Sequence, residues 1–404
     1  MKKIYLDHGA TTPVDKKVLA AMLPYFSEKF GNAMSIHSFG SVANEAVEKA
    51  RKQTADFFGA KPEEIIFTSG ATESNNLVVK GVVSAHYKNN KNIPHIITTA
   101  FEHHCVLDAC KEMERSGMAE VTFVKPDKEG IVSVKDIERA IKPNTMLVSM
   151  MYVNNEIGTV QPIAEIGKII SKIDEQRAVN NKVSFHTDAT QAINYFDCDI
   201  NKLGVDLLSM SAHKIYGPKG IGALYIRKGT AIKRMQDGGG QEAGKRAGTH
   251  NVPGIVGLGA AISMINEQRT KNNKKIIELR NYLISGVLKE IPEAKLNGSK
   301  TKRSPNNANF SFRNVEGESL LLMLDIEGIA ASTGSACTSG SLEPSHVLLS
   351  LGMKHEDAHG SLRLTLGKGT TKKEIDYTIK KLKEIVEKIR KVSGHVLEEY
   401  YSQK

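Results

Sequence analysis

Polar residues and glycines gather just after apolar, strand-like segments of this chain, where open α/β sheets place their ligands. The cluster at 186–191 puts the carboxylate of Asp188 at the end of such a segment. Burial there is costly unless a cation, such as a protonated pyridine nitrogen, is present. The cluster at 209–220 puts Lys214 at the end of the next strand, where desolvation can remove its proton and allow a Schiff base. Taken singly, these two residues could also form a structural ion pair.

Two further clusters suggest an anion site and a reactive thiol. Residues 68–74 follow a strand-like segment and open a helix, so their hydroxyls and backbone N–H groups suit a phosphate, although a plain helix cap would use the same residues. Residues 332–341 are rich in glycine and serine, a composition that favours a mobile, exposed loop. Because cysteine is normally buried, Cys337 in this loop indicates reactivity. The remaining cysteines lie in or beside apolar segments and are expected to be structural: Cys105, Cys110 and Cys198.

Two other patterns suggest chemistry that the surrounding residues do not support. Residues 239–245 have the spacing of a phosphate-binding P-loop, but Arg246 stands where Ser or Thr must hold magnesium, and no apolar strand precedes them. His103 and His104, with Glu102, suggest a metal, but adjacent side chains on a helix point apart and no third ligand is evident. We therefore expect no metal site, and a different task for a histidine at a helix start.

Alternating helix-like and strand-like segments from about residue 15 to 266 predict βα units around a mainly parallel sheet. The clearest helix should begin with Ser41 as its N-cap, run to Phe58 and stop at Gly59. Apolar runs predict buried strands at 64–67, 95–99, 145–152, 183–186, 206–210 and 221–226, and later at 308–312 and 361–366.

The regular alternation of helix-like and strand-like segments ends beyond the lysine-rich segment 269–275, and a final helix is expected from Lys372. A chain of 404 residues exceeds the usual size of a single core. We therefore predict an α/β protein with a large domain at 15–263 and a smaller α+β domain formed by 1–14 and 264–404. No low-complexity linker separates them, so they should share a broad interface.

The composition, with 40% hydrophobic and 25% charged residues, is that of an ordinary globular protein. Lys and Arg exceed Asp and Glu by 10, which would favour an anionic ligand, an acidic partner or nucleic acid. The excess is densest in the helix-like segments 271–275 and 372–391, where solvated helix faces are the simpler explanation. Four cysteines without a CxxC pair fit a reducing compartment, and no apolar run has signal or membrane-span length. We expect a cytoplasmic protein.

In this order, the clusters resemble those of the cysteine desulfurases of the class V aminotransferase group, in its IscS/NifS-like branch. The resemblance covers nearly the whole chain. It rests on motifs at 5–13 (YLDHGATTP), 67–74 (FTSGATES), 153–158 (VNNEIG), 186–191 (HTDATQ), 213–220 (HKIYGPKG), 246–249 (RAGT) and 335–339 (SACTS). It implies a type I fold of transferases that depend on pyridoxal 5'-phosphate (PLP).

The resemblance also implies roles for individual residues around PLP. Lys214 would bind the cofactor as a Schiff base, Asp188 would pair with the pyridine nitrogen, and His103 would stack on the ring and handle protons. Asn155 and Gln191 would contact the ring hydroxyl. The phosphate would be bound by residues from several segments, the last of them supplied by the partner subunit of a homodimer: Ala71, Thr72, Ser211, His213 and Thr249.

The implied substrate is L-cysteine, bound by Asn32 and by Arg363 through a bidentate pair with the carboxylate. Lys214 would remove the α-proton, and the thiolate of Cys337 would attack the substrate sulfur, leaving a persulfide and alanine. An iron–sulfur scaffold or a sulfur-carrier protein would accept the sulfur, with tRNA thiolation as another destination. The basic helix 372–391 is one candidate docking face, and no direct binding of nucleic acid is expected.

Some positions depart from the family pattern. Ala33 stands where proline is usual, His8 and Gly9 where Asn-Asn or Tyr-Ser is commoner, and Thr333 where serine is usual. These changes remove no catalytic group. Two alternatives stay open: a related PLP enzyme, such as a selenocysteine lyase or an aminotransferase, which Cys337 disfavours, and a basic binding or scaffold protein that keeps the fold without the chemistry.

Overall fold

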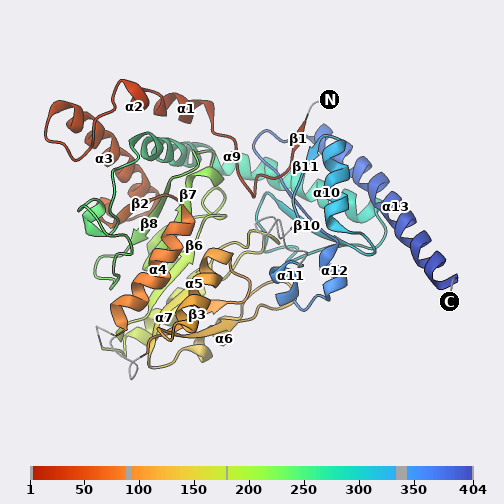
Figure 1. The fold of residues 1–404 in the computed structure, drawn as a ribbon, viewed down its shortest axis with the longest axis horizontal. Coiled ribbons are helices and arrows are strands. Elements are labelled where there is room, and N and C mark those ends of the chain that lie inside the picture. Colours follow the sequence, from red (N-terminus) through yellow and green to blue (C-terminus); the bar gives the residue numbers. More distant parts are fainter. Residues whose placement is uncertain (1–2, 88–92, 179–180, 334–343, 403–404) are drawn as a thin grey trace.

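The structure, a computed structural model, describes residues 3–87, 93–178, 181–333 and 344–402. Within these residues the largest sheet has seven strands in the order β2-β8-β7-β6-β5-β3-β4 (Figure 1). β8 runs antiparallel to both neighbours, and the other pairings are parallel, which confirms the predicted mainly parallel sheet. The strands are β2 (Ile65–Thr68), β3 (His95–Thr99), β4 (Glu120–Val124), β5 (Thr145–Met151), β6 (Ser184–Asp188), β7 (Leu207–Ser211) and β8 (Gly222–Ile226).

Each apolar run that was predicted to form a strand in this sheet does so, with ends shifted by no more than two residues. The strand that the sequence reading missed is β4, at the edge of the sheet. Four of its five residues are exposed or only partly buried. An edge strand needs no continuous apolar run, so its pattern is hard to distinguish from that of a loop.

Helices surround this sheet, and a helix-rich second unit follows it. The helices up to the end of the first unit are α1 (Lys16–Met22), α2 (Pro24–Ser27), α3 (Ser38–Phe58), α4 (Ala71–His86), α5 (His104–Arg115), α6 (Val134–Ala140), α7 (Ile163–Asp174) and α8 (Ile200–Leu203). Those that follow are α9 (Val252–Glu290), α10 (Gly317–Ile326), α11 (His346–Ser350), α12 (His355–His359) and α13 (Lys372–Ser402). The described part of the chain also contains the short 3-10 turns η1 (Pro62–Glu64), η3 (Ala212–Lys214) and η4 (Glu242–Gly244).

The predicted N-cap of α3 was four residues too late. His37 is the N-cap, and its ring nitrogen accepts a hydrogen bond from the N–H of Gly40, so Ser41 lies inside the helix. A histidine cap is rarer than a serine cap, which explains the error. The predicted stop is confirmed, because Gly59 adopts the left-handed conformation, with φ of 67°, that ends a helix.

A smaller antiparallel sheet has the order β12-β10-β9, built from β9 (Ala294–Leu296), β10 (Asn307–Phe312) and β12 (Ser361–Thr365). Beside it, β1 (Ile4–Tyr5) pairs in parallel with β11 (Ile329–Ala330). The first residues of the chain therefore pack with its last third. None of the helices within the described ranges combines the length and apolar character that a membrane crossing requires.

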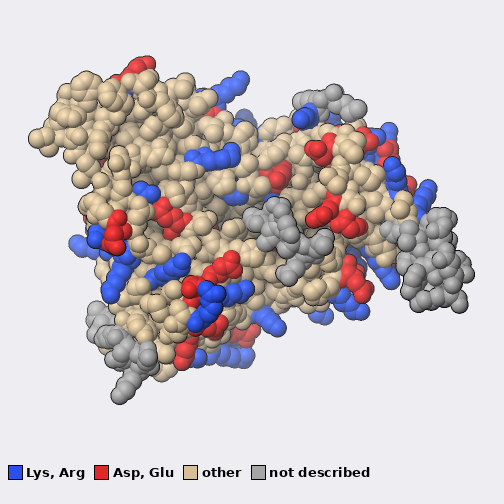
Figure 2. All heavy atoms as spheres, in the orientation of Figure 1, with Lys and Arg blue, Asp and Glu red and all other residues tan. Residues whose placement is uncertain are grey.

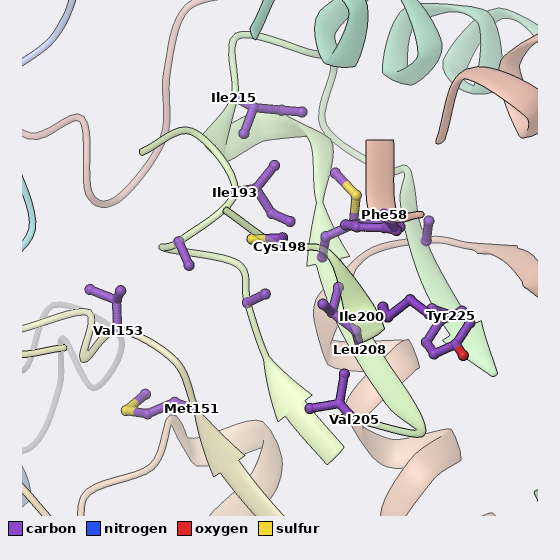
Figure 3. Close-up of a cluster of buried hydrophobic side chains, with 14 of the residues drawn as sticks. Phe58, Met151, Val153, Ile193, Cys198, Ile200, Val205, Leu208, Ile215 and Tyr225 are labelled. Carbon is purple, nitrogen blue, oxygen red and sulfur yellow. The ribbon is translucent and has the colours of Figure 1, made fainter. Parts of the chain in front are cut away.

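Helix α9 joins two separate cores. Its apolar side chains up to Ile265 pack in the core of the large sheet, and those from Ile276 onward pack with the smaller sheet. Figure 3 shows part of the first core, in which Phe58, Leu208 and Tyr225 lie between the sheet and its neighbouring helices. The domain boundary expected between residues 263 and 264 falls inside this continuous helix, so the division into domains stays a prediction.

Candidate active site

The carboxyl ends of β5, β6 and β7 meet at one edge of the large sheet. The strand register pairs Met151 with Asp188, and Asp188 with Ser209. The chain then leaves β5 toward Asn155 and leaves β7 through η3, which ends at Lys214. Three predicted cofactor residues are thus supplied by neighbouring strand ends, which is where ligands bind in open α/β sheets.

Asp188 is a buried carboxylate that is bound by neutral donors. It is 7% exposed, and its oxygens accept hydrogen bonds from the side-chain amide of Asn75 at 2.7 Å and the N–H of Thr190 at 2.9 Å. Neutral donors orient the carboxylate without cancelling its charge, so a cationic ring nitrogen fits beside it. The sequence reading missed Asn75, although it lies one helical turn after Ala71 and therefore on the same face of α4.

The amine of Lys214 lies against the N-terminal segment. Its Nζ donates hydrogen bonds to the carbonyl oxygens of Gly9 and Ala10, each at 2.6 Å. The side-chain amide of Gln191 donates to the same carbonyl of Gly9 at 3.0 Å. The motif at 5–13 is thereby brought to the ends of β6 and β7, and it holds the nitrogen that is proposed to bind the cofactor.

The N-terminus of α4 forms a cradle for an anion. Its N-cap is Gly70, whose φ of 152° few other residues adopt, and no side chain caps this helix in the described structure. A Cβ atom on Gly222 would lie 2.7 Å from the Cα of Gly70, so both backbones need glycine to pass this closely. Free N–H groups from Ala71 and Thr72 and the hydroxyl of Ser211, which lies beside Gly70, suit a phosphate. The plain side-chain cap is therefore not the arrangement found.

His213 completes this side of the site. Burial lowers the pKa of its imidazole to about 4, with Lys214 and Lys219 adding to the effect. One ring nitrogen lies 3.1 Å from the hydroxyl of Thr11. A neutral imidazole with one partnered nitrogen keeps its other nitrogen for a ligand such as a phosphate.

His103 caps helix α5, as expected of a histidine at a helix start. Its Nδ1 accepts a hydrogen bond from the N–H of Cys105 at 3.3 Å and lies 3.0 Å from the sulfur of the same residue. Burial lowers the pKa of His103. Glu102 accepts hydrogen bonds from the hydroxyl of Thr99 and the N–H of Met151 in β5, and within the described residues no group of three or more His, Cys, Asp or Glu side chains is placed to hold a metal ion.

Arg363, from β12 of the smaller sheet, reaches this edge of the large sheet. It is 4% exposed and donates to the carbonyl of Asn155 at 2.9 Å and to a carboxylate oxygen of Asp7 at 3.0 Å. Its buried Nε and the buried Oδ1 of Asn155 have no hydrogen-bond partner in the described structure. A spare donor and a spare acceptor, beside a buried carboxylate, a lysine and an anion cradle, fit PLP and a substrate carboxylate.

Three predicted site residues are not brought to this cluster. Asn32 and Thr249 are exposed, and neither forms a hydrogen bond or ion pair with another predicted site residue within the described chain. Cys337 lies outside the described residues. The residues on either side of its segment are anchored at the site, however. Ser332 forms a β-bridge with Arg363, and the hydroxyl of Ser345 donates to the carboxylate of Glu156.

The P-loop-like stretch has a structural role. Glu242 within it receives two hydrogen bonds from Arg51 of α3, at 2.8 and 2.9 Å, and one from the N–H of Phe67 in β2. His250 contacts the same carboxylate at 2.7 Å. These contacts clamp the segment before α9 onto the strand that leads to the anion cradle.

Comparisons with known proteins identify the family of the chain. The family model of class-V aminotransferases matches residues 4–378. A cysteine desulfurase IscS of Dictyoglomus turgidum is 50% identical over 394 residues, covering 98% of this chain and 97% of the relative. A human cysteine desulfurase is 47% identical over 396 residues, covering 97% of this chain and 84% of the relative.

Solved structures give the same result. A NifS-like protein superposes with a TM-score of 0.88 and 38% identity, covering 96% of this chain and 100% of that structure. A structure of SspA in complex with cysteine has a TM-score of 0.78 and 36% identity, covering 92% of this chain and 100% of that structure. The chain belongs to the class-V aminotransferase family and, within it, to the IscS/NifS-like cysteine desulfurases, which depend on PLP.

Proposed function

We propose that this desulfurase converts L-cysteine to L-alanine through Lys214, Asp188 and His103, and passes the sulfur to Cys337 as a persulfide. The observation that carries the proposal is the buried carboxylate of Asp188, held by neutral donors at the strand end next to the one that supplies Lys214. When bound, PLP supplies an electron sink for charge that develops at the substrate α-carbon.

The protein's own groups supply binding, orientation and proton transfer. Asp188 keeps the ring-nitrogen side of the site negative, so a proton on that nitrogen is favoured. The spare Nε of Arg363 offers a donor to the carboxylate of cysteine. The Nζ of Lys214 is the base for the α-proton, because it enters the site between the N-terminal segment and β7.

Short chain segments join Cys337 to the two anchored residues on either side of it. Cys337 comes five positions after Ser332, a span of at most about 17 Å, and eight positions before Ser345, a span of at most about 28 Å. Its thiolate attacks the sulfur of cysteine. A sulfur–sulfur bond forms as the carbon–sulfur bond breaks, and a later acceptor thiol removes the sulfur from the persulfide.

The acceptor side and the oligomeric state are parts of the same proposal. We infer that an iron–sulfur scaffold or a sulfur-carrier protein takes the sulfur, in line with the IscS name of the relatives.

We also infer a homodimer. Its support is a group of large apolar side chains that lie exposed along α1 to α3: Leu19, Leu23, Phe26, Phe30, Met34, Ile36, Phe39 and Val42. A monomer rarely exposes so many together.

The test compares alanine and sulfide release from cysteine in the PLP-loaded protein and two variants. Cys337→Ala should abolish sulfide release in the presence of a reductant while the yellow cofactor absorbance persists. Cys198→Ala, which changes a buried cysteine of the large core, is the matched control and should retain activity. Undiminished desulfuration in Cys337→Ala would contradict the role of that thiol.

Binding of PLP is tested separately. Lys214→Ala should remove the absorbance of the covalently bound cofactor. A wild-type protein that stays colourless after reconstitution with PLP would instead favour the scaffold alternative.

A further inference from the structure

Four side chains at the site form a continuous series of polar contacts that the proposed mechanism does not use. The amide nitrogen of Asn75 donates to Asp188 at 2.7 Å and to the sulfur of Cys105 at 3.1 Å. That sulfur lies 3.0 Å from Nδ1 of His103, which also accepts the backbone N–H of Cys105. The series joins the carboxylate beside the proposed ring nitrogen to the histidine proposed to stack on the ring.

The direction of each hydrogen bond follows from the chemistry of its ends. A carboxylate accepts only, so Asn75 must turn its amide nitrogen toward Asp188, and its second hydrogen is then directed at the sulfur of Cys105. Burial raises the pKa of Cys105 to about 12, and the charge of Asp188 adds to the rise. The thiol therefore keeps its proton, which is left to donate to His103.

We propose that Cys105 is a positioning residue: its thiol and its backbone N–H both contact Nδ1 of His103, and by donating to this nitrogen they fix the imidazole in the neutral form that carries its proton on Nε2. This inference rests on the proposed role of His103 at the cofactor. If Nδ1 were protonated, its N–H would face the thiol and the backbone N–H of Cys105, which are both donors. The charged imidazole is therefore disfavoured, and the neutral ring is held in one orientation.

Charged groups around His103 act on its protonation in opposite directions, so an interaction that favours the neutral ring has an effect. Titratable groups act on this ring from its own helix, from β6, from η3 and from α11: His104, Asp108, Asp188, Lys214 and His346. Burial lowers the pKa of His103, and Lys214 acts in the same direction, but the nearby carboxylate of Asp188 favours the charged ring. The two donors of Cys105 oppose that carboxylate and also hold Nδ1 away from other partners.

The test measures the protonation of His103 directly in the PLP-loaded protein. NMR with histidine-selective isotope labels distinguishes the two neutral tautomers and the charged form, and the His103→Gln variant assigns the signal. In Cys105→Ala, the Nε2-protonated form should lose population, and the pKa of His103 should rise. The acid limb of the kcat profile should then move to higher pH. We expect kcat near pH 7 to fall about 3- to 10-fold, the factor that one hydrogen bond is worth, with KM for cysteine unchanged.

Two variants separate positioning from packing. Cys105→Ser keeps a hydroxyl donor and should restore the tautomer and the pH profile. Cys110→Ala removes a buried thiol from the same helix, away from His103, and should leave both unchanged. Wild-type tautomer populations and an unshifted pH profile in Cys105→Ala would overturn the proposal. The NMR readout does not depend on turnover, so failure of the proposed desulfuration would be visible separately, as absence of alanine and sulfide in the wild type.

Discussion

Asp188 is buried, and the hydrogen bonds that it accepts within the described residues come from neutral donors. The hydrogen bonds from Asn75 and Thr190 hold its oxygens in place. Groups preorganised in this way act on charge that develops during the reaction without having to reorient.

The Asp188→Asn change tests this role. It keeps the shape but removes the negative charge, so we expect kcat to fall by about 10²- to 10³-fold while cysteine still binds. Steady-state kinetics of alanine formation measures the loss. Asp206→Asn serves as the control, because Asp206 pairs with Arg227 and also supports β6 through the N–H of Phe185. It should lower stability but leave kcat within a few-fold of wild type, and an equal loss in both variants would contradict the electrostatic role.

A second buried carboxyl group, Glu102, makes stability depend on pH. Burial raises its pKa to about 8. The folded protein therefore keeps this proton while the unfolded chain, with a pKa near the usual 4.5, releases it. The protonated Glu102 stabilises the folded protein at low pH. As the pH rises from about 4.5 to about 8, the free energy of unfolding therefore falls by roughly 1 kcal/mol per pH unit. The Glu102→Gln variant cannot ionise and should show a shallower loss of Tm from pH 5 to 8.

Glu114→Gln is the matched control, because Glu114 is exposed on α5. It should follow the wild-type slope. Identical pH slopes for wild type and Glu102→Gln, measured by thermal unfolding in the same buffers, would show that Glu102 is ionised in the folded protein.

Sequence patterns could locate Lys214 and Asp188 because each follows an apolar strand, and strand ends are where α/β sheets place ligands. They could not locate Asn75 or the role of Cys105. Asn75 contacts Asp188 across 113 positions of the chain and contacts Cys105 across 30 positions. The apolar setting of Cys105 made it look structural, and only the fold shows that it contacts His103.

At the scale of elements, the clamp between Arg51 and Glu242 fixes how α3, β2 and the segment before α9 meet. Arg51 pulls the pKa of the Glu242 carboxyl down to about 2, against the opposing effect of burial. The clamp's stability is therefore fully present above the usual pKa of a glutamate and is lost as the pH falls from about 4.5 toward 2.

Arg51→Ala should cost about 3 to 5 kcal/mol, because it leaves the Glu242 carboxylate buried without its cation. Urea unfolding measures the change. Arg115→Ala, which removes an exposed arginine paired with Glu112, should cost less than about 1 kcal/mol. A small effect of Arg51→Ala would show that Glu242 is stabilised by its other donors.

The sequence predicted most of the large sheet because its central strands are buried on both faces and therefore read as apolar runs. The prediction was wrong where an element is stabilised by contacts with its neighbours and its own residues show no clear hydrophobic or capping pattern. Edge strand β4 is largely exposed, and α3 begins at a histidine cap whose ring makes the bond that serine usually makes.

At the scale of the molecule, the surface along α1 to α3 carries the proposed dimer contact. On the face shown in Figure 2, this region is largely free of charged side chains. Ile36 is fully exposed and Phe30 is 64% exposed. An apolar surface of this kind is stabilised when a second copy covers it.

Ile36→Asp combined with Phe30→Asp should shift the protein from dimer to monomer in sedimentation velocity. The control Leu322→Asp changes an apolar side chain that is 68% exposed on α10, far from these helices in Figure 1. It should leave the dimer intact. A wild-type protein that sediments as a monomer would contradict the inferred homodimer and the role of Thr249 in a partner's site.

The two cores support the proposed division of the chain near residue 264, since apolar contacts along α9 change from one core to the other between Ile265 and Ile276. The connection is helical and carries the lysine-rich segment 269–275 on its surface.

Helix α9 also has a mechanical consequence for substrate choice. Lys214 belongs to the part of the molecule packed on one half of this helix, and Arg363 to the part packed on the other half. A continuous 39-residue helix resists sharp bending unless it is broken by a proline, a bulge or an inserted group. We therefore expect α9 to limit changes in the spacing between the amine and the guanidinium, and so to favour amino acids whose α-carbon and carboxylate match that spacing.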